Sequence, residues 1–398
     1  MTRHLELTEG LPSVLLPLTS EEAEAINRME LAVAVRTVDP GVWEVTPSGK
    51  IGVARIGDLQ LTVRPKIGID RLIFLMGYAQ SPSFWRDTDV DLAPEDDLFS
   101  AIADAFARLA TRALDQGLLH GYRTTDDTLP VLRGRVREAE QISRRYGMMV
   151  PLEVRYDEFT ADIAENQVLL GAVHRLLRLP RISAQARRTL LRLRLQLADV
   201  SSLPRGAELP RWQPSRLNTR YQPALRFAEL ILAANSFEQR VGSLAVTGFV
   251  FDMWRIFEDF VCVALSEAMA GYGGRSDLQH RTHLDERRDV SMRPDYVWST
   301  GGHVRLVADA KYKAEKPAGF PQADLYQLLA YCTVLRLPDG HLIYAKGEEV
   351  PKRHVVAGSP VTIHCHTLDL ERSPAELLDQ VSRVATLMTQ GEWSAKAV

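Results

Sequence analysis

The stretch Val304-Arg-Leu-Val-Ala-Asp-Ala-Lys311 decides the expected fold of the C-terminal part of the chain. Its alternating residue types predict a β-strand, in which side chains two positions apart point to the same face. Asp309 and Lys311 would therefore share one face. Three apolar residues would point to the other face, toward a core: Val304, Leu306 and Ala308.

A second acidic residue is expected beside this strand. Asp295 ends the block Arg293-Pro-Asp, at the start of a neighbouring strand. Two carboxylates that converge from adjacent strands form an all-oxygen site suited to Mg²⁺, which Mn²⁺ could replace, and the Ala310 carbonyl would be a third ligand. The metal would polarise a phosphoryl oxygen and lower the pKa of a bound water. Lys311 would orient that water and stabilise the charge that develops on the phosphate.

Three further polar residues flank these two strands. Glu258 lies on an upstream helix, from which it could reach the site as an additional acid. Gln327 and Tyr331 are four positions apart on a downstream helix and share one face, where they could orient Lys311 or a water. This order of helix, strand, strand and helix resembles the PD-(D/E)xK nuclease superfamily, and the resemblance implies a DNA-cleaving site.

A plain salt bridge at the end of a strand is the alternative interpretation. Asp309 or Asp295 would then pair with Lys311 or Lys313 and have no chemical role. Such a pair does not require three acids and a glutamine–tyrosine pair around one strand.

Five blocks, spread over most of the chain, carry a closer resemblance to the McrC family, the nuclease subunits of the McrBC modification-dependent restriction systems. The blocks are Leu132-Arg-Gly-Arg-Val136; Tyr156-Asp-Glu-Phe-Thr160 with Glu165-Asn-Gln-Val168; Phe249-Val-Phe-Asp-Met253 with Phe257-Glu-Asp-Phe-Val261; Arg293-Pro-Asp295 with Asp309-Ala-Lys-Tyr-Lys313; and Asp324-Leu-Tyr-Gln-Leu-Leu-Ala-Tyr331. The first two point to McrC in particular. Trp254 departs from the family pattern, which more often has a small polar residue there, and we expect it to lie outside the metal site.

The resemblance implies a division of labour between two chains. In the family, a partner AAA+ GTPase hexamer, McrB, recognises methylated or otherwise modified cytosine and translocates double-stranded DNA. The McrC subunit docks through its N-terminal region, stimulates GTP hydrolysis and cuts. Independently, this sequence has no G-x-x-x-x-G-K-[ST] phosphate loop, because Pro47-Ser-Gly-Lys50 lacks the leading glycine and the final Ser or Thr. We therefore expect no nucleotide to bind to this chain itself.

Composition indicates a soluble globular protein. The chain has 398 residues, 45% of them apolar and 25% charged, which predicts two or three domains. No apolar run approaches the roughly 20 residues needed to span a membrane, and the N-terminus does not resemble a signal peptide. Cys262, Cys332 and Cys365 are scattered without C-x-x-C spacing, so a cytoplasmic location is expected.

The pattern of elements predicts an α+β multidomain fold in three parts. Residues 1–93 would form a small antiparallel, barrel-like β domain that docks on the partner, because short β-branched runs alternate there with turn residues. Residues 94–243 would be mainly helical, apart from an extended stretch over 129–156. Residues 244–398 would form an α/β nuclease domain of the restriction-endonuclease type with a mixed sheet.

An arginine-rich segment stands out in the expected middle domain. Between Arg175 and Arg226 there are twelve arginines, no lysine and two acids, so this segment carries +10 and the rest of the chain −13 of the net −3. Such a segment attracts a polyanion, with nucleic acid as the first candidate, although an acidic partner protein or a solvated helix face fits equally well. The candidate contacts to DNA or partner are Arg64, Lys66, Arg133, Arg135, Arg187, Arg188, Arg192 and Arg194.

Several of these contacts have a local alternative. Arg133 and Arg135 would lie on one face of an extended segment, where an ion pair with Glu138 or Glu140 is as good an explanation. Arg64-Pro-Lys66 could be a loop inserted into a partner ring or an ordinary hairpin end.

Two other functions compete with a partner-dependent nuclease. The chain could be a non-catalytic adaptor that activates an AAA+ motor, but the intact set of two acids and a lysine speaks against this. It could also be a stand-alone DNA repair nuclease, although the 240 or so residues before the expected nuclease domain make that less attractive.

Overall fold

Turn residues separate the N-terminal strands where the sequence predicts them. Strands β3 (Ala32–Arg36), β4 (Val42–Pro47), β5 (Lys50–Ile56) and β6 (Leu59–Arg64) follow the expected runs. Four elements were not expected: β1 (Arg3–Thr8), β2 (Val14–Pro17), α1 (Ser20–Met29) and α2 (Ile69–Gln80). The two helices depart from the β domain predicted for residues 1–93. Helix α1 begins with a capping box, in which Thr19 and Glu22 bond each other's backbone N–H, and this signature was present in the sequence.

The N-terminal strands belong to two sheets. One has the order β1-β6-β5-β11-β10 and takes its last two strands, β10 (Asn235–Val241) and β11 (Leu244–Asp252), from far along the chain. The other has the order β2-β4-β3. The prediction of an antiparallel domain is wrong in one respect, because β1 and β6 pair in parallel.

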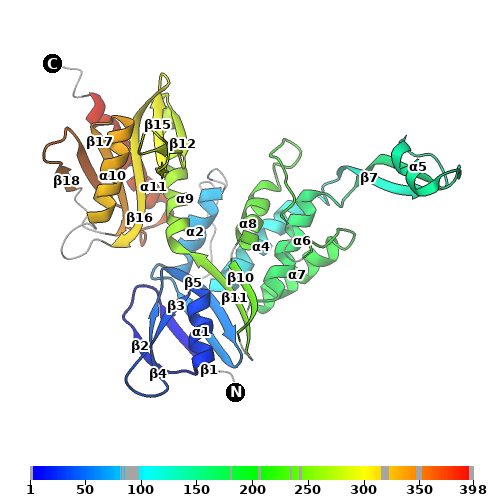
Figure 1. Ribbon diagram of the computed structural model, residues 1–398, viewed down its shortest axis with the longest axis horizontal. Coiled ribbons are helices and arrows are strands. Elements are labelled where there is room, and N and C mark those ends of the chain that lie inside the picture. The colour runs from blue at the N-terminus through cyan, green and yellow to red at the C-terminus, as the bar shows by residue number, and fades with distance from the viewer. Residues whose placement is uncertain are drawn as a thin grey trace. The chain divides into compact units, whose positions relative to one another are not determined.

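The computed structural model shown in Figure 1 describes residues 3–80, 82, 85, 98–179, 182–204, 208–233, 235–241, 244–314, 322–346 and 352–393. It divides into two units, residues 1–98 with 234–398, and residues 99–233. The first and third of the expected domains thus lie in one unit, where β11 pairs with β5. The boundaries at residues 93 and 243 remain predictions. No helix in the described ranges is long and apolar enough to cross a membrane.

A six-stranded mixed sheet forms the C-terminal part of the first unit. Its order is β12-β15-β16-β17-β19-β18. The strands are β12 (Arg275–Leu278), β15 (Tyr296–Thr300), β16 (His303–Ala314), β17 (Asp339–Lys346), β18 (Lys352–Val355) and β19 (Thr362–Thr367), and a separate pair is formed by β13 (Thr282–His283) and β14 (Ser291–Met292). Strand β16 is antiparallel to β15 and parallel to β17. The strand expected from Val304 to Lys311 is therefore confirmed as β16.

Four helices pack around this sheet and each other. They are α2 (Ile69–Gln80), α9 (Met253–Met269), α10 (Gln322–Leu335) and α11 (Pro374–Trp393), and the short 3-10 helix η1 (Ala270–Tyr272) follows α9. Helix α9 begins later than expected because residues 250–252 belong to β11. Phe260 of α9 meets the rings of Phe74 and Tyr78 on α2.

Both faces of β16 are covered. Leu306 and Ala308 are buried as predicted. However, Val307 is also buried, in a cluster with Leu328 and Tyr331 of α10. The expectation of a core on one face alone was therefore wrong, because strands of a sheet with helices on both sides are apolar on both faces.

The second unit contains the four predicted helices and a projecting arm. The helices are α4 (Leu98–Leu114), α6 (Ala164–Leu177), α7 (Ala184–Gln196) and α8 (Gln222–Ala233). The arm consists of β7 (Gly121–Leu129), β8 (Arg135–Val136), α5 (Glu138–Arg145) and β9 (Leu152–Thr160), and it extends away from α6 and α7 (Figure 1). The expected extended stretch over 129–156 is wrong over α5.

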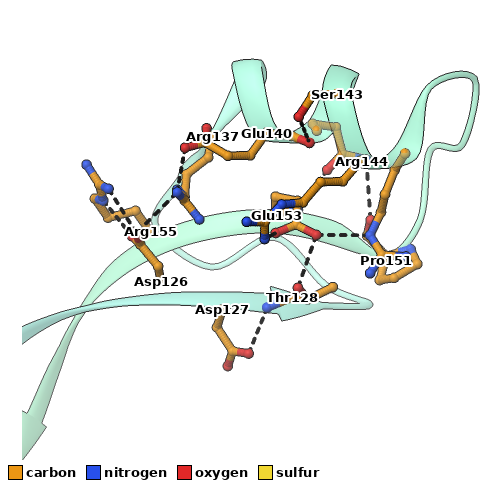
Figure 2. A network of polar contacts seen from close by, with 12 residues as sticks. Asp126, Asp127, Thr128, Arg137, Glu140, Ser143, Arg144, Pro151, Glu153 and Arg155 are labelled. Carbon is orange, nitrogen blue, oxygen red and sulfur yellow. Dashed lines mark hydrogen bonds and ion pairs between the residues drawn. The ribbon is translucent and has the colours of Figure 1, made fainter.

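Ion pairs hold the end of the arm together in place of an apolar core. Helix α5 has no buried residue. Arg155 bonds Asp126 across the two strands with two nitrogens, at 2.6 and 2.9 Å. Glu153, 2% exposed, accepts from Arg145 at 3.0 Å. It also accepts from the Thr128 hydroxyl at 3.1 Å (Figure 2). The charges of the arm are thus mutually compensated.

Candidate active site

Asp295 lies just before β15 and is held in place by the neighbouring strand. Its Oδ2 accepts from the Ala310 backbone N–H at 2.9 Å, and its Oδ1 accepts from Gln279 Nε2 at 3.2 Å. The residue is only 8% exposed. The backbone of β16 therefore fixes the orientation of this carboxylate, as the expected convergence of the two strands requires.

Asp309 and Lys311 meet as predicted. The Lys311 ammonium is in ion-pair contact with Asp309 Oδ2. That oxygen is buried, and Asp309 as a whole is 2% exposed. The salt bridge of the alternative interpretation thus exists, and it lies beside the carboxylate of Asp295, whose charge helps to raise the pKa of Asp309.

Gln327 and Tyr331 continue the contact from Lys311 onto α10. Lys311 Nζ donates to Gln327 Oε1 at 3.0 Å, and Gln327 Nε2 donates to the Tyr331 hydroxyl at 2.8 Å. Their spacing of four positions places both side chains on the same helix face. The ammonium of Lys311 is therefore held between a carboxylate and an amide.

Glu258 reaches the site from α9 through a residue that the sequence did not point to. Gln279 Nε2 donates to Glu258 Oε1 as well as to Asp295. Gln279 has a positive φ of 54° and its N–H donates to the Asp295 carbonyl at 2.8 Å. A lone glutamine in a turn-rich stretch carries no sequence signal for such a role.

A cavity of about 610 Å³ opens over these side chains. The lining residues not described above are Trp254, Arg255, Asp259, Arg293 and Tyr312. Trp254, expected outside the metal site, is 54% exposed and lines the same cavity. Arg255 and Arg293 are exposed, whereas Asp295 and Asp309 are buried. Acidic groups thus lie deep in the cavity, and exposed cationic groups also line it.

The acidic residues repel one another's negative charge. Burial, with the nearby charge of Glu258, raises the pKa of Asp295 to about 6, and burial, with the charge of Asp295, raises the pKa of Asp309 to about 7. Burial also raises the pKa of Glu258. Burial alone would lower the pKa of Lys311, but the carboxylates of Asp309 and Asp295 raise it overall. Lys311 therefore stays protonated and cannot serve as a base near neutral pH.

The donor set suits a magnesium ion. In the described ranges, no group of three or more His, Cys, Asp or Glu side chains is arranged to hold a metal. Mg²⁺ needs no such cage, because it commonly binds one or two carboxylates and keeps several waters. Asp295, Asp309 and the Ala310 carbonyl fit this requirement, because two buried carboxylates and a backbone carbonyl supply oxygen donors in one cavity.

Arg64 and Lys66, the two expected contacts to DNA or partner in this unit, do not line the cavity. Arg64 pairs with Glu6, and Lys66 Nζ lies 4.4 Å from the ring centroid of Tyr312. Both residues therefore have contacts within the chain. Whether either also touches another molecule stays a prediction.

The arginines of the second unit differ in their surroundings. Gly134 has a φ of +71°, and a side chain there would meet the Arg155 carbonyl at 2.3 Å, so the segment is not simply extended. Arg133 stacks on the Tyr156 ring at 3.8 Å, and Arg137, not Arg133 or Arg135, pairs with Glu140. On α7, the four expected arginines are all exposed, whereas Ala186, Leu190 and Leu193 are buried.

Comparison with known proteins agrees with this architecture. The fold is similar to a chain of the refined half-complex from the tetradecameric assembly of Thermococcus gammatolerans McrB AAA+ hexamers with bound McrC, with a TM-score of 0.56 at 16% identity over 97% of this chain and 100% of that chain. A chain of the Thermococcus gammatolerans McrBC complex has a TM-score of 0.40 at 17% identity over 67% of this chain and 88% of that chain. No curated protein matches the sequence.

A family model supplies the assignment. The model described as "McrBC 5-methylcytosine restriction system component" matches residues 45–345, which is most of the chain. This range includes Asp295, Asp309 and Lys311. The chain belongs to the McrBC restriction system component family.

Proposed function

We propose that this chain is the DNA-cleaving subunit of a modification-dependent restriction complex and hydrolyses phosphodiester bonds with Mg²⁺. The observation that supports this most is the fixed pair of buried carboxylates beside a protonated lysine in one cavity. The family assignment agrees with a role in restriction. Asp295, Asp309 and the Ala310 carbonyl would hold the ion.

The side chains of this site have separate tasks in hydrolysis. When bound, Mg²⁺ supplies Lewis acidity toward a phosphoryl oxygen and makes water more acidic. Lys311, fixed by Asp309 and Gln327, presents a positive charge to the phosphate as negative charge develops there. Glu258 lines the same cavity and is not one of the proposed metal ligands, so it is the acid that would accept a proton from attacking water.

The decisive experiment separates cleavage from partner activation. Lys311→Ala and Asp309→Ala should each lower the rate of DNA cleavage by the complete complex by a factor of about 10² to 10³ or more. Stimulation of the partner's GTP hydrolysis should stay at the wild-type level, because the side chains of both residues contact other residues that line the cavity. Survival of cleavage in both variants would show that the site has been assigned wrongly.

A partner is part of the proposal. The similar solved structure contains McrB AAA+ hexamers with bound McrC, and we propose that a McrB-like hexameric GTPase likewise binds this chain. Residues 1–93 remain the proposed docking region. The outer face of the sheet β2-β4-β3 offers apolar contacts there, because Leu15, Val33 and Val35 are 64%, 51% and 54% exposed.

The two competing functions give different results in one assay. A non-catalytic adaptor would stimulate GTP hydrolysis but would leave modified plasmid uncut at any Mg²⁺ concentration. A stand-alone nuclease would cut without the GTPase. We expect cleavage only when the GTPase, GTP and a modified DNA are all present.

A further inference from the structure

The C-terminal end of β16, the strand that carries Asp309 and Lys311, lacks the pairing with two neighbouring strands that supports its N-terminal part. Strand β15 pairs with β16 only as far as Ala308. On the other side, the pairing with β17 loses its register between Lys311 and Ala314. Backbone hydrogen bonds to neighbouring strands therefore support Lys311 from one side, and Tyr312 has no regular strand partner among the described residues.

Side chains hold Tyr312 instead. Its hydroxyl donates to Glu9 Oε2 at 3.1 Å. The Lys66 ammonium lies 4.4 Å from its ring centroid, close enough for a cation–π interaction. The Phe257 ring of α9 lies 5.9 Å away, centroid to centroid. Tyr312 also lines the catalytic cavity, so movement of this residue would change the wall of the site.

Parallel pairing in the N-terminal sheet brings Glu9 and Lys66 together. Strands β1 and β6 run in the same direction and end side by side, with Thr8 opposite Arg64. Glu9 N–H then donates to the Arg64 carbonyl at 2.9 Å, and the Glu9 carboxyl accepts from the Lys66 backbone N–H. Glu9 is only 5% exposed, and a buried acid of this kind is tolerated only where its hydrogen bonds are made.

We propose that Glu9, Lys66 and Tyr312 form a positioning clamp that holds the unpaired end of β16 and so keeps Lys311 in place. Tyr312 acts through its neighbour Lys311 and is a positioning residue. The catalytic consequence rests on the proposed nuclease function, whereas the structural consequence does not. The clamp makes Glu9 and Lys66, which precede Lys311 by 302 and 245 residues, part of the support of the active site.

Hydrogen exchange of the full-length chain tests the clamp without any assumption about activity. Tyr312→Phe removes the hydroxyl but keeps the ring, and Glu9→Leu removes the acceptor. Each should raise amide exchange over residues 309–314 by about tenfold, the effect of losing one hydrogen bond to a charged group. Tyr272→Phe is the matched control, because its hydroxyl contacts Thr386 at 3.4 Å on an exposed part of the same unit, and it should leave this segment unchanged.

Cleavage kinetics of the complete complex test the consequence for Lys311. Tyr312→Phe should lower kcat by about tenfold with KM for DNA within about twofold, because the clamp affects geometry and not substrate binding. Lys66→Met should lower kcat by a similar factor. Glu9→Gln keeps an acceptor for the tyrosine and Lys66→Arg keeps a cation over its ring. Both conservative variants should restore most of the activity.

The outcomes separate the clamp from the nuclease proposal. Unchanged exchange over residues 309–314 in Tyr312→Phe and Glu9→Leu overturns the clamp. Exchange that rises equally over β15, β17 and β19 also overturns it, since these residues would then serve only the general fold. If the wild-type complex does not cleave DNA but the exchange rises locally, the nuclease function fails and the clamp stands.

Discussion

The cavity around Asp309 and the arm of residues 121–160 use charge in opposite ways. In the cavity, the carboxyls of Asp295, Asp309 and Glu258 lie together, and each has a raised pKa. In the arm, three acids have an arginine beside them. Asp126 bonds Arg155, which lowers the pKa of Asp126, Glu153 bonds Arg145, which lowers the pKa of Glu153, and Glu140 pairs with Arg137. One region has excess negative charge and the other is neutralised.

This difference shows what each region lacks. The cavity has a single lysine against several carboxylates, and under the proposed function a cation would complete it. The arm has its charges paired but leaves large apolar side chains in water, and such a group on one short segment marks an interaction surface. The exposed apolar residues between its strands are Val131, Leu132, Ile142, Tyr146, Met148, Met149 and Val150.

The largest effect is expected when one of the mutually repelling carboxylates in the cavity is neutralised. Asp309 has a raised pKa, so between about pH 4 and 7 the folded chain holds more protons than the unfolded chain. The contribution of this group to stability is therefore full at low pH and is lost as pH rises through about 7. Asp309→Asn should raise the metal-free free energy of unfolding at pH 8 by a few kcal/mol, measured by chemical denaturation, and should abolish cleavage.

The arm provides the matched control for this substitution. Asp126 has a lowered pKa, so its contribution is present above its unfolded pKa and is lost as pH falls through its lower folded pKa. Asp126→Asn should therefore loosen the arm at neutral pH, seen as faster amide exchange over β7 and β9. If Asp309→Asn and Asp126→Asn both loosened the structure around them, or both stabilised it, the cavity and the arm would not differ electrostatically.

The next prediction concerns binding to the GTPase. It tests whether the exposed apolar residues of the arm form an interface. Met149 is 86% exposed, and Met149→Asp should weaken association with the GTPase by about tenfold or more, because a buried interface charge without a partner is costly. Val35→Asp, on the N-terminal sheet, should weaken it by less, because fewer exposed apolar residues surround it. Titration of the GTPase against each variant measures both. If Met149→Asp binds as wild type, the arm tip is not an interface.

Sequence alone predicted the parts of the site that depend on periodicity. The alternation of β16 placed Asp309 with Lys311, and the helical spacing placed Gln327 with Tyr331. The clamp on Tyr312 could not be predicted, because it depends on β1 and β6 ending together, which is a matter of long-range pairing. Gln279 was missed because its contact with Asp295 likewise depends on the pairing of separate chain segments and not on local residue spacing.

The arm shows a second limit of prediction from sequence. Its alternating residues indicated extended structure, but α5 interrupts it. Nothing on this helix is buried, so the apolar periodicity that identifies a helix packed on a core was absent. The helices α6 and α7, which bury one face, lie in the range of residues 94–243 that was expected to be mainly helical.

The smallest effect concerns a third arrangement, positive charge without compensating acids. Helix α7 contains no Asp or Glu, and its exposed Arg187, Arg188, Arg192 and Arg194 form no ion pair among the described residues. Each arginine that contacts a DNA phosphate releases counterions and adds about 0.9 to the slope of log K against log salt concentration. Arg192→Gln should therefore reduce that slope by about 0.9 and weaken DNA binding equally for modified and unmodified sequences.

Arg28→Gln is the matched control, since Arg28 on α1 is paired with Glu24 and should not alter the slope. If the slope is unchanged in Arg192→Gln while GTPase binding weakens, this helix face binds an acidic protein surface instead of DNA.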